Sequence, residues 1–288
     1  MTITHQKPKI RLNRGPEYQF VQNVVTENQL NTVCEEARCP NIYECWGRRT
    51  ATIMILGDTC TRACGFCSVK TGKPEFNDTM EPTRTAMAVK KMNLRHVVIT
   101  SVDRDDLKDD FGAEMWAETI RQIHQHAPNC TVEVLTPDFK GHEPALDTVF
   151  NAEPEIFGHN VETVERISRE VRNQANWQRS MDVLIYAVKN HQRTKTGMMV
   201  GLGETNDEIL ETMRQVANVG VEIFTIGQYL QPTKNNLTVK RYVSDTEFDM
   251  YKQAGKEMGF KVVESGVLVR SSYHADEQAR FAITTNTK

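Results

Sequence analysis

The chain has 288 residues, of which 39% are apolar, so it can bury a sizeable core. Its 35 Lys and Arg residues and 38 Asp and Glu residues give a net charge of -3, which excludes broad nucleic-acid binding because phosphate binding needs concentrated positive charge. No apolar run approaches the roughly 20 residues of a membrane helix, and no secretory signal opens the chain, so we expect a cytoplasmic protein outside the membrane.

Apolar runs of β type alternate with amphipathic stretches along most of the chain. The runs predict strands at 51–56, 97–100, 131–135, 155–158, 196–200 and 222–226. The stretches between and after them predict helices at 81–93, 113–126, 143–151, 161–171, 177–191 and 206–219. Helical spacing also occurs within 17–36, and either Thr205 or Asn206 can cap the helix near 206.

Six strand–helix repeats predict a parallel sheet that is buried on both faces. Periodicity alone fits both an open doubly wound sheet and a barrel, and six units are too few for a full eight-stranded barrel. We therefore predict an α/β fold with a partial (β/α)6 TIM-like barrel over 51–262. An N-terminal extension (1–50) and a C-terminal extension (263–288) flank it. Ligands are expected where the strands end and their following loops begin.

Six of the seven cysteines lie within residues 34–67, and only Cys130 lies elsewhere. A disulfide framework would spread its cysteines along a small secreted chain, so this clustering favours a metal or an iron–sulfur cluster. Cys130 is predicted to be an inert buried thiol.

A C-x3-C-x2-C motif, formed by Cys60, Cys64 and Cys67, follows the first predicted strand. Three thiolates on one loop can bind three irons of a [4Fe–4S] cluster and leave the fourth iron open for a cofactor. A structural zinc site is the alternative, but zinc sites usually show two C-x2-C pairs or histidines at fixed spacing.

A C-x4-C-x5-C motif, formed by Cys34, Cys39 and Cys45, precedes the first predicted strand. It also falls one ligand short of a closed cube. Free thiols or zinc are alternatives here, although no histidine lies nearby in the sequence to complete a zinc site.

With Phe66 before its third cysteine, the C-x3-C-x2-C motif resembles the radical S-adenosylmethionine (radical SAM) superfamily. The two cysteine motifs in this order, together with the R-S-S-Y sequence at 270–273, resemble the lipoyl synthases. The resemblance implies that Cys60, Cys64 and Cys67 bind the cluster that cleaves S-adenosylmethionine. It also implies a second, auxiliary [4Fe–4S] cluster on the other triad, with a serine of R-S-S-Y as fourth ligand; Ser272 is favoured and Ser271 is the alternative.

Five further stretches resemble this family: 100–107, 133–139, 158–164, 195–205 and 226–232. The resemblance implies that contacts to S-adenosylmethionine or substrate come from Phe66, Ser101, Asp103, Glu133, Asn160, Glu162, Met199, Gln228 and Tyr229. Tyr43, Trp46 and Met199 are candidates for the wall of an apolar substrate tunnel. Phe111 stands where the family usually has glycine, and we expect it to alter that loop; Thr136 and Lys140 also differ.

The resemblance implies sulfur insertion at C6 and C8 of an octanoyl group on a lysine of a lipoyl carrier domain. Unactivated methylenes offer no group for acid–base or nucleophilic catalysis, so a radical is needed, and the auxiliary cluster would supply the sulfur. Expected partners are the glycine-cleavage H protein, 2-oxoacid dehydrogenase E2 subunits, and an electron donor such as ferredoxin or flavodoxin.

Two alternatives remain at this point. One is another radical enzyme that inserts sulfur or transfers methylthio groups, although such enzymes carry other cysteine spacings or a basic nucleic-acid-binding domain. The other is a non-catalytic two-cluster electron carrier, which would not cleave S-adenosylmethionine.

Overall fold

The computed structural model describes residues 14–48, 50–75 and 78–284. They form two compact units. The N-terminal unit comprises described residues within 14–63 and 68–158, and the C-terminal unit comprises 64–67 and 159–284. Residues 1–13, 49 and 285–288, which belong to the two predicted extensions, lie outside the described residues.

The N-terminal unit contains a sheet whose main strands run parallel. In spatial order these strands are β2 (Thr52–Ile55), β5 (His96–Ser101), β6 (Thr131–Leu135) and β7 (Ile156–Gly158). The short β1 (Asn31–Thr32) pairs antiparallel with β2. Ile53, Ile99 and Val134 are paired across neighbouring strands and are fully buried. Their β-branched side chains explain why this sequence forms strands.

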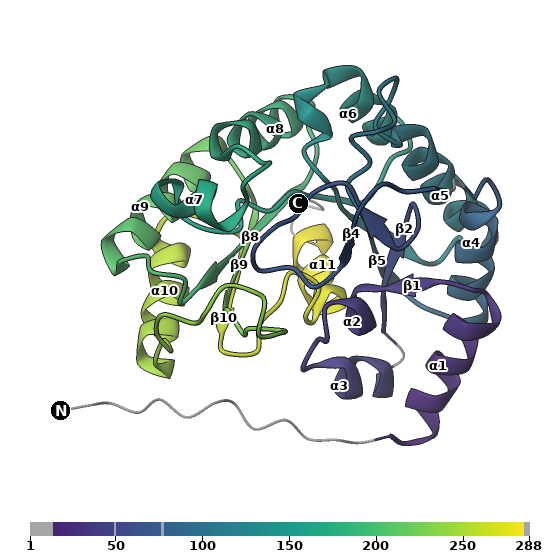
Figure 1. The fold of residues 1–288 in the computed structure, drawn as a ribbon, viewed down its shortest axis with the longest axis horizontal. Coiled ribbons are helices and arrows are strands. Elements are labelled where there is room, and N and C mark those ends of the chain that lie inside the picture. Colours follow the sequence, from purple (N-terminus) through teal and green to yellow (C-terminus); the bar gives the residue numbers. More distant parts are fainter. Residues whose placement is uncertain (1–13, 49, 76–77, 285–288) are drawn as a thin grey trace. The chain divides into compact units, whose positions relative to one another are not determined.

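Three helices follow these strands and cover the outer face of the sheet in this unit (Figure 1). They are α4 (Glu81–Met92), α5 (Ala113–His126) and α6 (Glu143–Phe150). The remaining elements are α1 (Pro16–Glu27), α2 (Val33–Glu36), α3 (Ile42–Gly47), the 3₁₀ turn η1 (Phe139–Gly141), and the paired strands β3 (Thr59–Cys60) and β4 (Lys70–Thr71).

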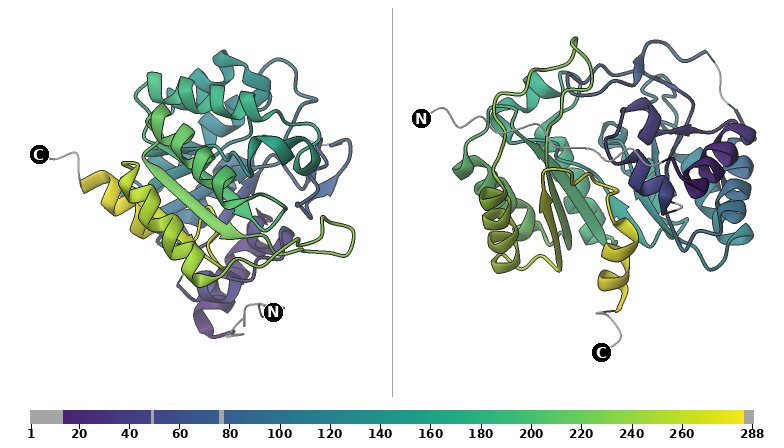
Figure 2. Two further views of the ribbon diagram at one scale, coloured as in Figure 1. Left: turned by 90° about the vertical axis from the view of Figure 1, so that its left-hand side faces the viewer. Right: turned by 90° about the horizontal axis from the view of Figure 1, so that it is seen from below.

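Helix α1 lies beside α4 (Figure 2, right). Arg84 donates a 3.0 Å hydrogen bond to the carbonyl oxygen of Asn28, and Lys91 pairs with Glu27. The helical spacing within 17–36 does not form one helix, because Gln29 adopts a left-handed φ of 52° and the chain then pairs with β2.

The C-terminal unit has three parallel strands: β8 (Thr194–Val200), β9 (Ile223–Gln228) and β10 (Val262–Gly266). Helices α8, α9 and α10 lie on their outer side (Figure 1), and α10 runs alongside β10 (Figure 2). The helices of this unit are α7 (Glu165–Val171), α8 (Trp177–Lys189), α9 (Asn206–Val219), α10 (Asp245–Glu257) and α11 (Ala275–Thr284). The apolar faces of α7, α8, α9 and α10 form one core with Phe224 and Ile226 of β9.

All six predicted strands are present, whereas β10, α10 and α11 were not predicted. Thr205 is the cap of α9: its side chain and that of Glu208 form a capping box, and Gly220 ends the helix with a φ of 98°. Among the described residues, no helix combines the length and the apolar character that crossing a bilayer requires.

Phe111 occupies a backbone conformation that favours glycine. Its φ is 55°, and Gly112 follows with a φ of 85°. The phenyl ring packs edge-on against His142, with 5.8 Å between ring centroids. Left-handed backbone costs a residue with a side chain roughly 1–2 kcal/mol, so the ring contact offsets part of the strain that glycine would avoid.

Candidate functional site

The cysteine loop in the N-terminal unit begins with a sharp turn directly after β2. Leu56 and Gly57 both adopt left-handed conformations, with φ values of 67° and 88°. The buried carboxylate of Glu81 accepts hydrogen bonds from both of their backbone N–H groups, at 2.6 and 3.3 Å. Burial raises the pKa of Glu81, and these two hydrogen bonds oppose the rise. Glu81 therefore fixes where the loop leaves the strand.

Cys60 is surrounded by hydrogen-bond partners suited to a cluster ligand. Its Sγ accepts backbone hydrogen bonds from Arg62 at 3.4 Å and from Asp103 at 3.3 Å. The Asp103 carboxylate lies 3.8 Å from the same sulfur. Backbone donors aimed at a sulfur stabilise its thiolate form and adjust the potential of a bound cluster. Two sequence-predicted residues, Cys60 and Asp103, are thus brought together.

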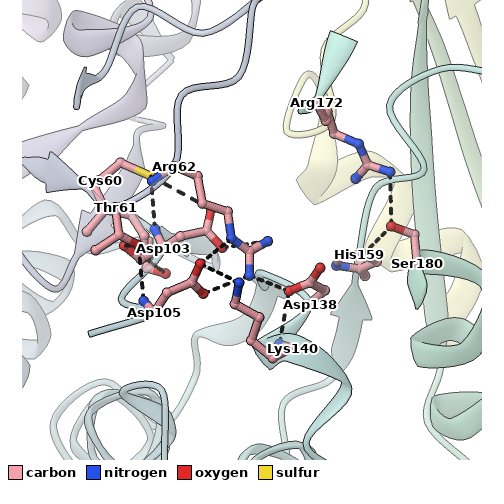
Figure 3. A network of polar contacts seen from close by, with 12 residues as sticks. Cys60, Thr61, Arg62, Asp103, Asp105, Asp138, Lys140, His159, Arg172 and Ser180 are labelled. Carbon is pink, nitrogen blue, oxygen red and sulfur yellow. Dashed lines mark hydrogen bonds and ion pairs between the residues drawn. The ribbon is translucent and has the colours of Figure 1, made fainter. Parts of the chain in front are cut away.

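Arg62 ties the cysteine loop to the loops that follow β5 and β6 (Figure 3). Its guanidinium donates two hydrogen bonds to Asp105, at 2.8 and 2.9 Å, and one to Asp138, at 2.6 Å. It also lies 3.1 Å from Asp103, and the ammonium of Lys140 lies 2.9 Å from Asp105. Sequence reasoning missed Arg62, although a charged residue inside C-T-R-A-C is a signal of such a role.

The electrostatics of this network follow from its burial. Burial raises the pKa of Asp103 to about 6, while the Arg62 guanidinium opposes the rise. Asp105 is also partly buried, yet its hydrogen bonds from Arg62 and Lys140 lower its pKa overall. Burial would lower the pKa of Arg62, but its carboxylate partners raise it overall. One buried guanidinium therefore compensates the charge of several carboxylates.

The other two cysteines of this motif belong to the C-terminal unit, where the segment 64–67 is held by main-chain and side-chain contacts. The Gly65 N–H donates to Val171 O, and the Leu237 N–H donates to Gly65 O, both at 2.9 Å. The amide of Asn236 donates to Gly65 O at 3.3 Å and to Cys67 O at 2.8 Å. A Cβ on Gly65 would come within 2.8 Å of Leu237, so this approach requires glycine.

Phe66, the aromatic residue of the motif, is partly buried and packs against the apolar core of the C-terminal unit. This contact gives the segment a second anchor besides its hydrogen bonds. Cys64 and Cys67 on either side are half-buried.

The second triad lies wholly within the N-terminal unit. Cys34 on α2 is buried, Cys45 on α3 is half-buried, and Cys39 lies in the turn between these helices. Burial raises the pKa of Cys34 and Cys45 to about 12, and the neighbouring Cys39 sulfur raises both further. Burial opposes the thiolate forms of Cys34 and Cys45, and bound iron would compensate their negative charge, so this triad suits a cationic iron cluster.

Cys130 contrasts with this triad. It is 3% exposed, and burial raises its pKa to about 12. The predicted inert thiol fits these features. Within the part of the chain that the structure describes, no three His, Cys, Asp or Glu residues are arranged around a single metal ion. A cube spaces its ligands more widely, since four irons and four sulfides lie between them.

Tyr43 and Trp46, the predicted tunnel walls, take part in an aromatic group of the N-terminal unit. Tyr18 stacks on Tyr43 with 5.5 Å between ring centroids and lies 5.0 Å from Trp46. Trp46 is fully buried, so it packs as a core residue beside the triad, whereas Tyr43 is half-buried.

Asn160, Glu162 and Met199 lie together in the C-terminal unit. The Asn160 amide donates to the Glu162 carboxylate at 3.1 Å. Glu162 has a left-handed φ of 65°, and its carbonyl accepts a 2.8 Å hydrogen bond from the Met199 N–H. Burial raises the pKa of Glu162, while the nearby Arg172 opposes the rise. A strained acidic residue of this kind is typical of functional loops.

Arg172 lies in a separate buried network (Figure 3). It donates to Ser180 Oγ at 3.1 Å and to the Asn160 carbonyl at 3.3 Å. His159 Nε2 lies 3.0 Å from the same serine oxygen. His159 is therefore a hydrogen-bonded core histidine. The side chain of its neighbour Asn160 contacts Glu162 and Ser271 instead.

Ser101 and Glu133 lie on strands of the N-terminal unit. Ser101 ends β5, and its hydroxyl donates to the carbonyl of Val102 at 2.8 Å. Glu133 lies in the middle of β6, where it is 1% exposed, and its carboxylate lies 3.5 Å from His96 Nε2.

Gln228 and Tyr229, at the end of β9, bind main-chain groups. The Gln228 amide donates to Arg241 O at 3.1 Å and accepts from the Val243 N–H at 2.8 Å. The Tyr229 hydroxyl donates to Leu237 O at 2.7 Å, and burial raises the pKa of Tyr229 to about 12. Tyr229 therefore positions the segment that includes Asn236 and Leu237, and Gln228 positions the main chain at 241–243.

Ser271 and Ser272 follow β10 in the C-terminal unit. The Ser271 hydroxyl accepts a 2.8 Å hydrogen bond from Asn160, and Ser272 is half-buried. The structure thus brings Ser271, Asn160 and Glu162 together within one unit.

Solved structures of other proteins resemble this fold. Streptococcus suis SuiB bound to S-adenosylmethionine matches with a TM-score of 0.58 and 9% identity, covering 78% of this chain and 54% of that one. HydG, a maturase of the [FeFe]-hydrogenase, matches with a TM-score of 0.57 and 12% identity, covering 78% and 53%. These likenesses concern the fold alone, and they confirm the predicted α/β class of the partial-barrel type.

Sequence comparisons identify the family. The model of the "Radical SAM superfamily" matches residues 54–216. The lipoyl synthase of Rubrobacter xylanophilus is 56% identical, covering 96% of this chain and 88% of that protein. The lipoyl synthase of Flavobacterium psychrophilum is 52% identical, covering 93% of each, and the mitochondrial lipoyl synthase of Nematostella vectensis is 50% identical, covering 94% of each. The chain belongs to the lipoyl synthase family within the radical SAM superfamily.

Proposed function

We propose that this chain is a sulfurtransferase of the radical SAM type that converts a protein-bound octanoyl group into a lipoyl group. The observation that carries the proposal is the presence of two cysteine triads with different surroundings. One follows β2 on a loop tied down by buried polar contacts, and the other lies on α2 and α3 among buried aromatic residues. Two distinct clusters give such a protein both a radical source and a sulfur source.

Cys60, Cys64 and Cys67 would hold the first cluster and leave one iron open for S-adenosylmethionine. When bound, the cluster and S-adenosylmethionine together supply the radical that removes hydrogen from an unactivated methylene. The protein's part is to position these groups: backbone donors from Arg62 and Asp103 support the Cys60 sulfur, and Asn236 holds the segment that carries Cys67.

Cys34, Cys39, Cys45 and Ser272 would hold the auxiliary [4Fe–4S] cluster, the proposed donor of the two sulfur atoms. Ser272 is the favoured serine ligand and Ser271 is the alternative; Ser271 accepts a hydrogen bond from Asn160. An alkoxide binds iron in a soft sulfide cluster more weakly than a thiolate does, which suits a cluster that is consumed.

S-adenosylmethionine and substrate contacts are proposed for Phe66, Ser101, Asp103, Glu133, Asn160, Glu162 and Met199. Gln228 and Tyr229 would act on the cofactor through the main chain that they hold. The barrel would span 51–262, and the auxiliary-cluster ligands would come from two extensions, 1–50 and 263–288. Parts of both extensions lie outside the described residues.

The family implies an octanoyl group attached to a protein as the substrate. We propose the glycine-cleavage H protein and 2-oxoacid dehydrogenase E2 subunits as its carriers. Ferredoxin or flavodoxin is the proposed reductant, and the cytoplasm is the proposed compartment.

Two steps test the function in anaerobically reconstituted, reduced protein. S-adenosylmethionine alone should yield 5'-deoxyadenosine, and an octanoylated carrier peptide should then gain two sulfur atoms by mass. Replacing the first triad with alanine should abolish both products, whereas replacing the second triad should abolish only sulfur insertion. An intact chain that holds about eight irons but forms no 5'-deoxyadenosine would be an electron carrier and would contradict the proposal.

A further inference from the structure

We propose that Asn160 is a positioning residue that anchors the loop 267–274 through Ser271, so that Ser272 is presented to the auxiliary cluster. This inference rests on the proposed function, because the role of Ser272 as ligand belongs to that function. It assigns different roles to two adjacent serines: one holds the loop, and the other binds iron.

The central contact is a hydrogen bond between two loops of the C-terminal unit. Asn160 Nδ2 donates to Ser271 Oγ at 2.8 Å, across 111 positions of the chain. The same amide nitrogen donates to the Glu162 carboxylate at 3.1 Å. Both protons of the amide therefore have acceptors, which fixes the orientation of the side chain.

Asn160 is itself held by the main chain around it. The Asn160 carbonyl accepts a 3.3 Å hydrogen bond from Arg172. The preceding residue, His159, donates its N–H to Lys195 O at 3.0 Å, and its carbonyl accepts a 2.7 Å hydrogen bond from the Thr196 hydroxyl. Asn160 therefore extends from a fixed part of the unit and can act as an anchor for a less regular loop.

Two glycines leave room for the loop to lie against strands β8 and β9. A Cβ on Gly227 would overlap the carbonyl oxygen of Val269, so the loop passes directly over this position. A Cβ on Gly197 would lie 3.1 Å from Asn160 Oδ1 and 3.4 Å from Ser271 Oγ. The loop therefore packs against the two strand glycines and the Asn160 amide.

An anchored loop matters because a single serine oxygen is a weak iron ligand. If the loop were mobile, its backbone would have to become ordered when the serine binds iron. The conformational entropy lost in that ordering would weaken iron binding. The hydrogen bond through Ser271 orders the backbone next to Ser272 beforehand. Outer contacts of this kind commonly determine how firmly a ligand holds its metal.

The test compares Asn160→Ala, Ser271→Ala and the double variant in the anaerobic holoprotein. Hydrogen exchange of the peptide 267–274 and loss of iron from the auxiliary cluster are measured in each. Each single variant should raise amide exchange in this peptide about tenfold, as expected for the loss of one partly buried hydrogen bond. Amide exchange and iron loss should be no faster in the double variant than in either single variant, because both substitutions remove the same contact.

The spectroscopic readout is the electron paramagnetic resonance signal of an oxidised three-iron cluster. The serine-bound iron leaves as Fe2+, and added ferricyanide removes one electron from the cluster that remains. The signal should grow faster in both single variants and should appear at once in Ser272→Ala. Asn190→Ala is the matched control: the side-chain amide of this exposed asparagine of the same unit donates to the Tyr186 carbonyl, and its loss should change neither readout.

Unchanged exchange and iron loss in Asn160→Ala and Ser271→Ala would overturn the anchoring role. Immediate iron loss in Ser271→Ala with a stable cluster in Ser272→Ala would overturn the assignment of the two serines. In both cases sulfur insertion by the unaltered chain would still support the proposed function. That function fails separately if the unaltered chain never holds a second cluster.

Discussion

The side-chain amide of Asn236 donates a 2.8 Å hydrogen bond to the carbonyl oxygen of Cys67, 169 residues earlier in the chain. A second hydrogen bond, of 3.3 Å, joins the same amide to Gly65 O. One distant side chain thus donates to two carbonyl groups of the cysteine segment.

Asn236→Ala should weaken cluster binding at the first triad, because it removes two hydrogen bonds to carbonyls of the cysteine segment, while Gly65 O keeps the N–H of Leu237. Each lost hydrogen bond costs about 0.5–1.5 kcal/mol. Asn236→Asp should be worse, since a carboxylate repels both carbonyls. Iron content and 5'-deoxyadenosine yield measure the effect. Asn235→Ala, at the exposed neighbouring position, is the control, and equal loss in the control would contradict the role of Asn236.

Gly65 should not tolerate a methyl group. A Cβ would come within 2.8 Å of Leu237 Cγ and 2.9 Å of its Cδ1, so either the cysteine segment or Leu237 must move. We expect Gly65→Ala to assemble the first cluster poorly while the auxiliary cluster forms normally. Gly72→Ala is the matched control in the same region, because its Cβ would meet Thr59 at an ordinary 3.4 Å. Iron per chain and 5'-deoxyadenosine yield distinguish the two variants.

Arg62→Ala should strongly destabilise the N-terminal unit. The substitution leaves Asp103, Asp105 and the buried Asp138 without their common cation, and removing one partner from a buried pair costs about 3–5 kcal/mol. Arg62→Lys should recover only part of the lost stability, because an ammonium lacks the planar guanidinium that binds Asp105 through two hydrogen bonds.

Denaturant unfolding measures the effect of both Arg62 substitutions. Arg121→Ala is the control, because this half-exposed arginine also pairs with two carboxylates, Glu114 and Glu118. Exposed pairs contribute only about 0.2–1 kcal/mol. If the unfolding midpoints of Arg62→Ala and Arg121→Ala coincided, the network would not be a structural support of the loop.

The regular elements were predictable because their patterns are local. The strand at 131–135 is β-branched and apolar, and the cap at Thr205 lies within three residues of Glu208. Helix α10 was missed although Ser244 and Glu247 form the same capping signal, because the helix buries few residues and carries little apolar periodicity. The helical spacing within 17–36 predicted helix beyond Glu27, which is wrong, because pairing of Asn31 and Thr32 with β2 overrides helical propensity there.

The cysteines of the site were also predictable, because their spacing is local and specific. Their supports were not: Asn236 and Arg62 act through contacts between distant parts of the chain, which no short motif records. For Gln228, the sequence marks the residue but not what its side chain binds. The resemblance marks it as a site residue, but only the structure shows that its amide binds main-chain groups at Arg241 and Val243.

The His124 and Glu155 pair should give the N-terminal unit a stability that depends on pH. The His124 Nε2 lies 3.5 Å from the Glu155 carboxylate, which also accepts a 2.6 Å hydrogen bond from the Val132 N–H. Glu155 raises the pKa of His124 above its ordinary value of 6.5, with a further contribution from Glu153. Burial would raise the pKa of Glu155, but His124 and the backbone lower it overall below 4.5.

The contribution of the pair should therefore be full between about pH 4.5 and 6.5, where both groups are charged in either state of the chain. It is lost as pH rises through the raised pKa of His124, and also as pH falls through the lowered pKa of Glu155. His124→Gln should accordingly destabilise the chain by up to about 1 kcal/mol at pH 5.5 and by less at pH 8.5. Denaturant midpoints of variant and unaltered chain at the two pH values measure this, with His126→Gln on the same helix as control. An equal deficit at both pH values would mean that the side chain acts through packing, because only the charged form of His124 gains from Glu155.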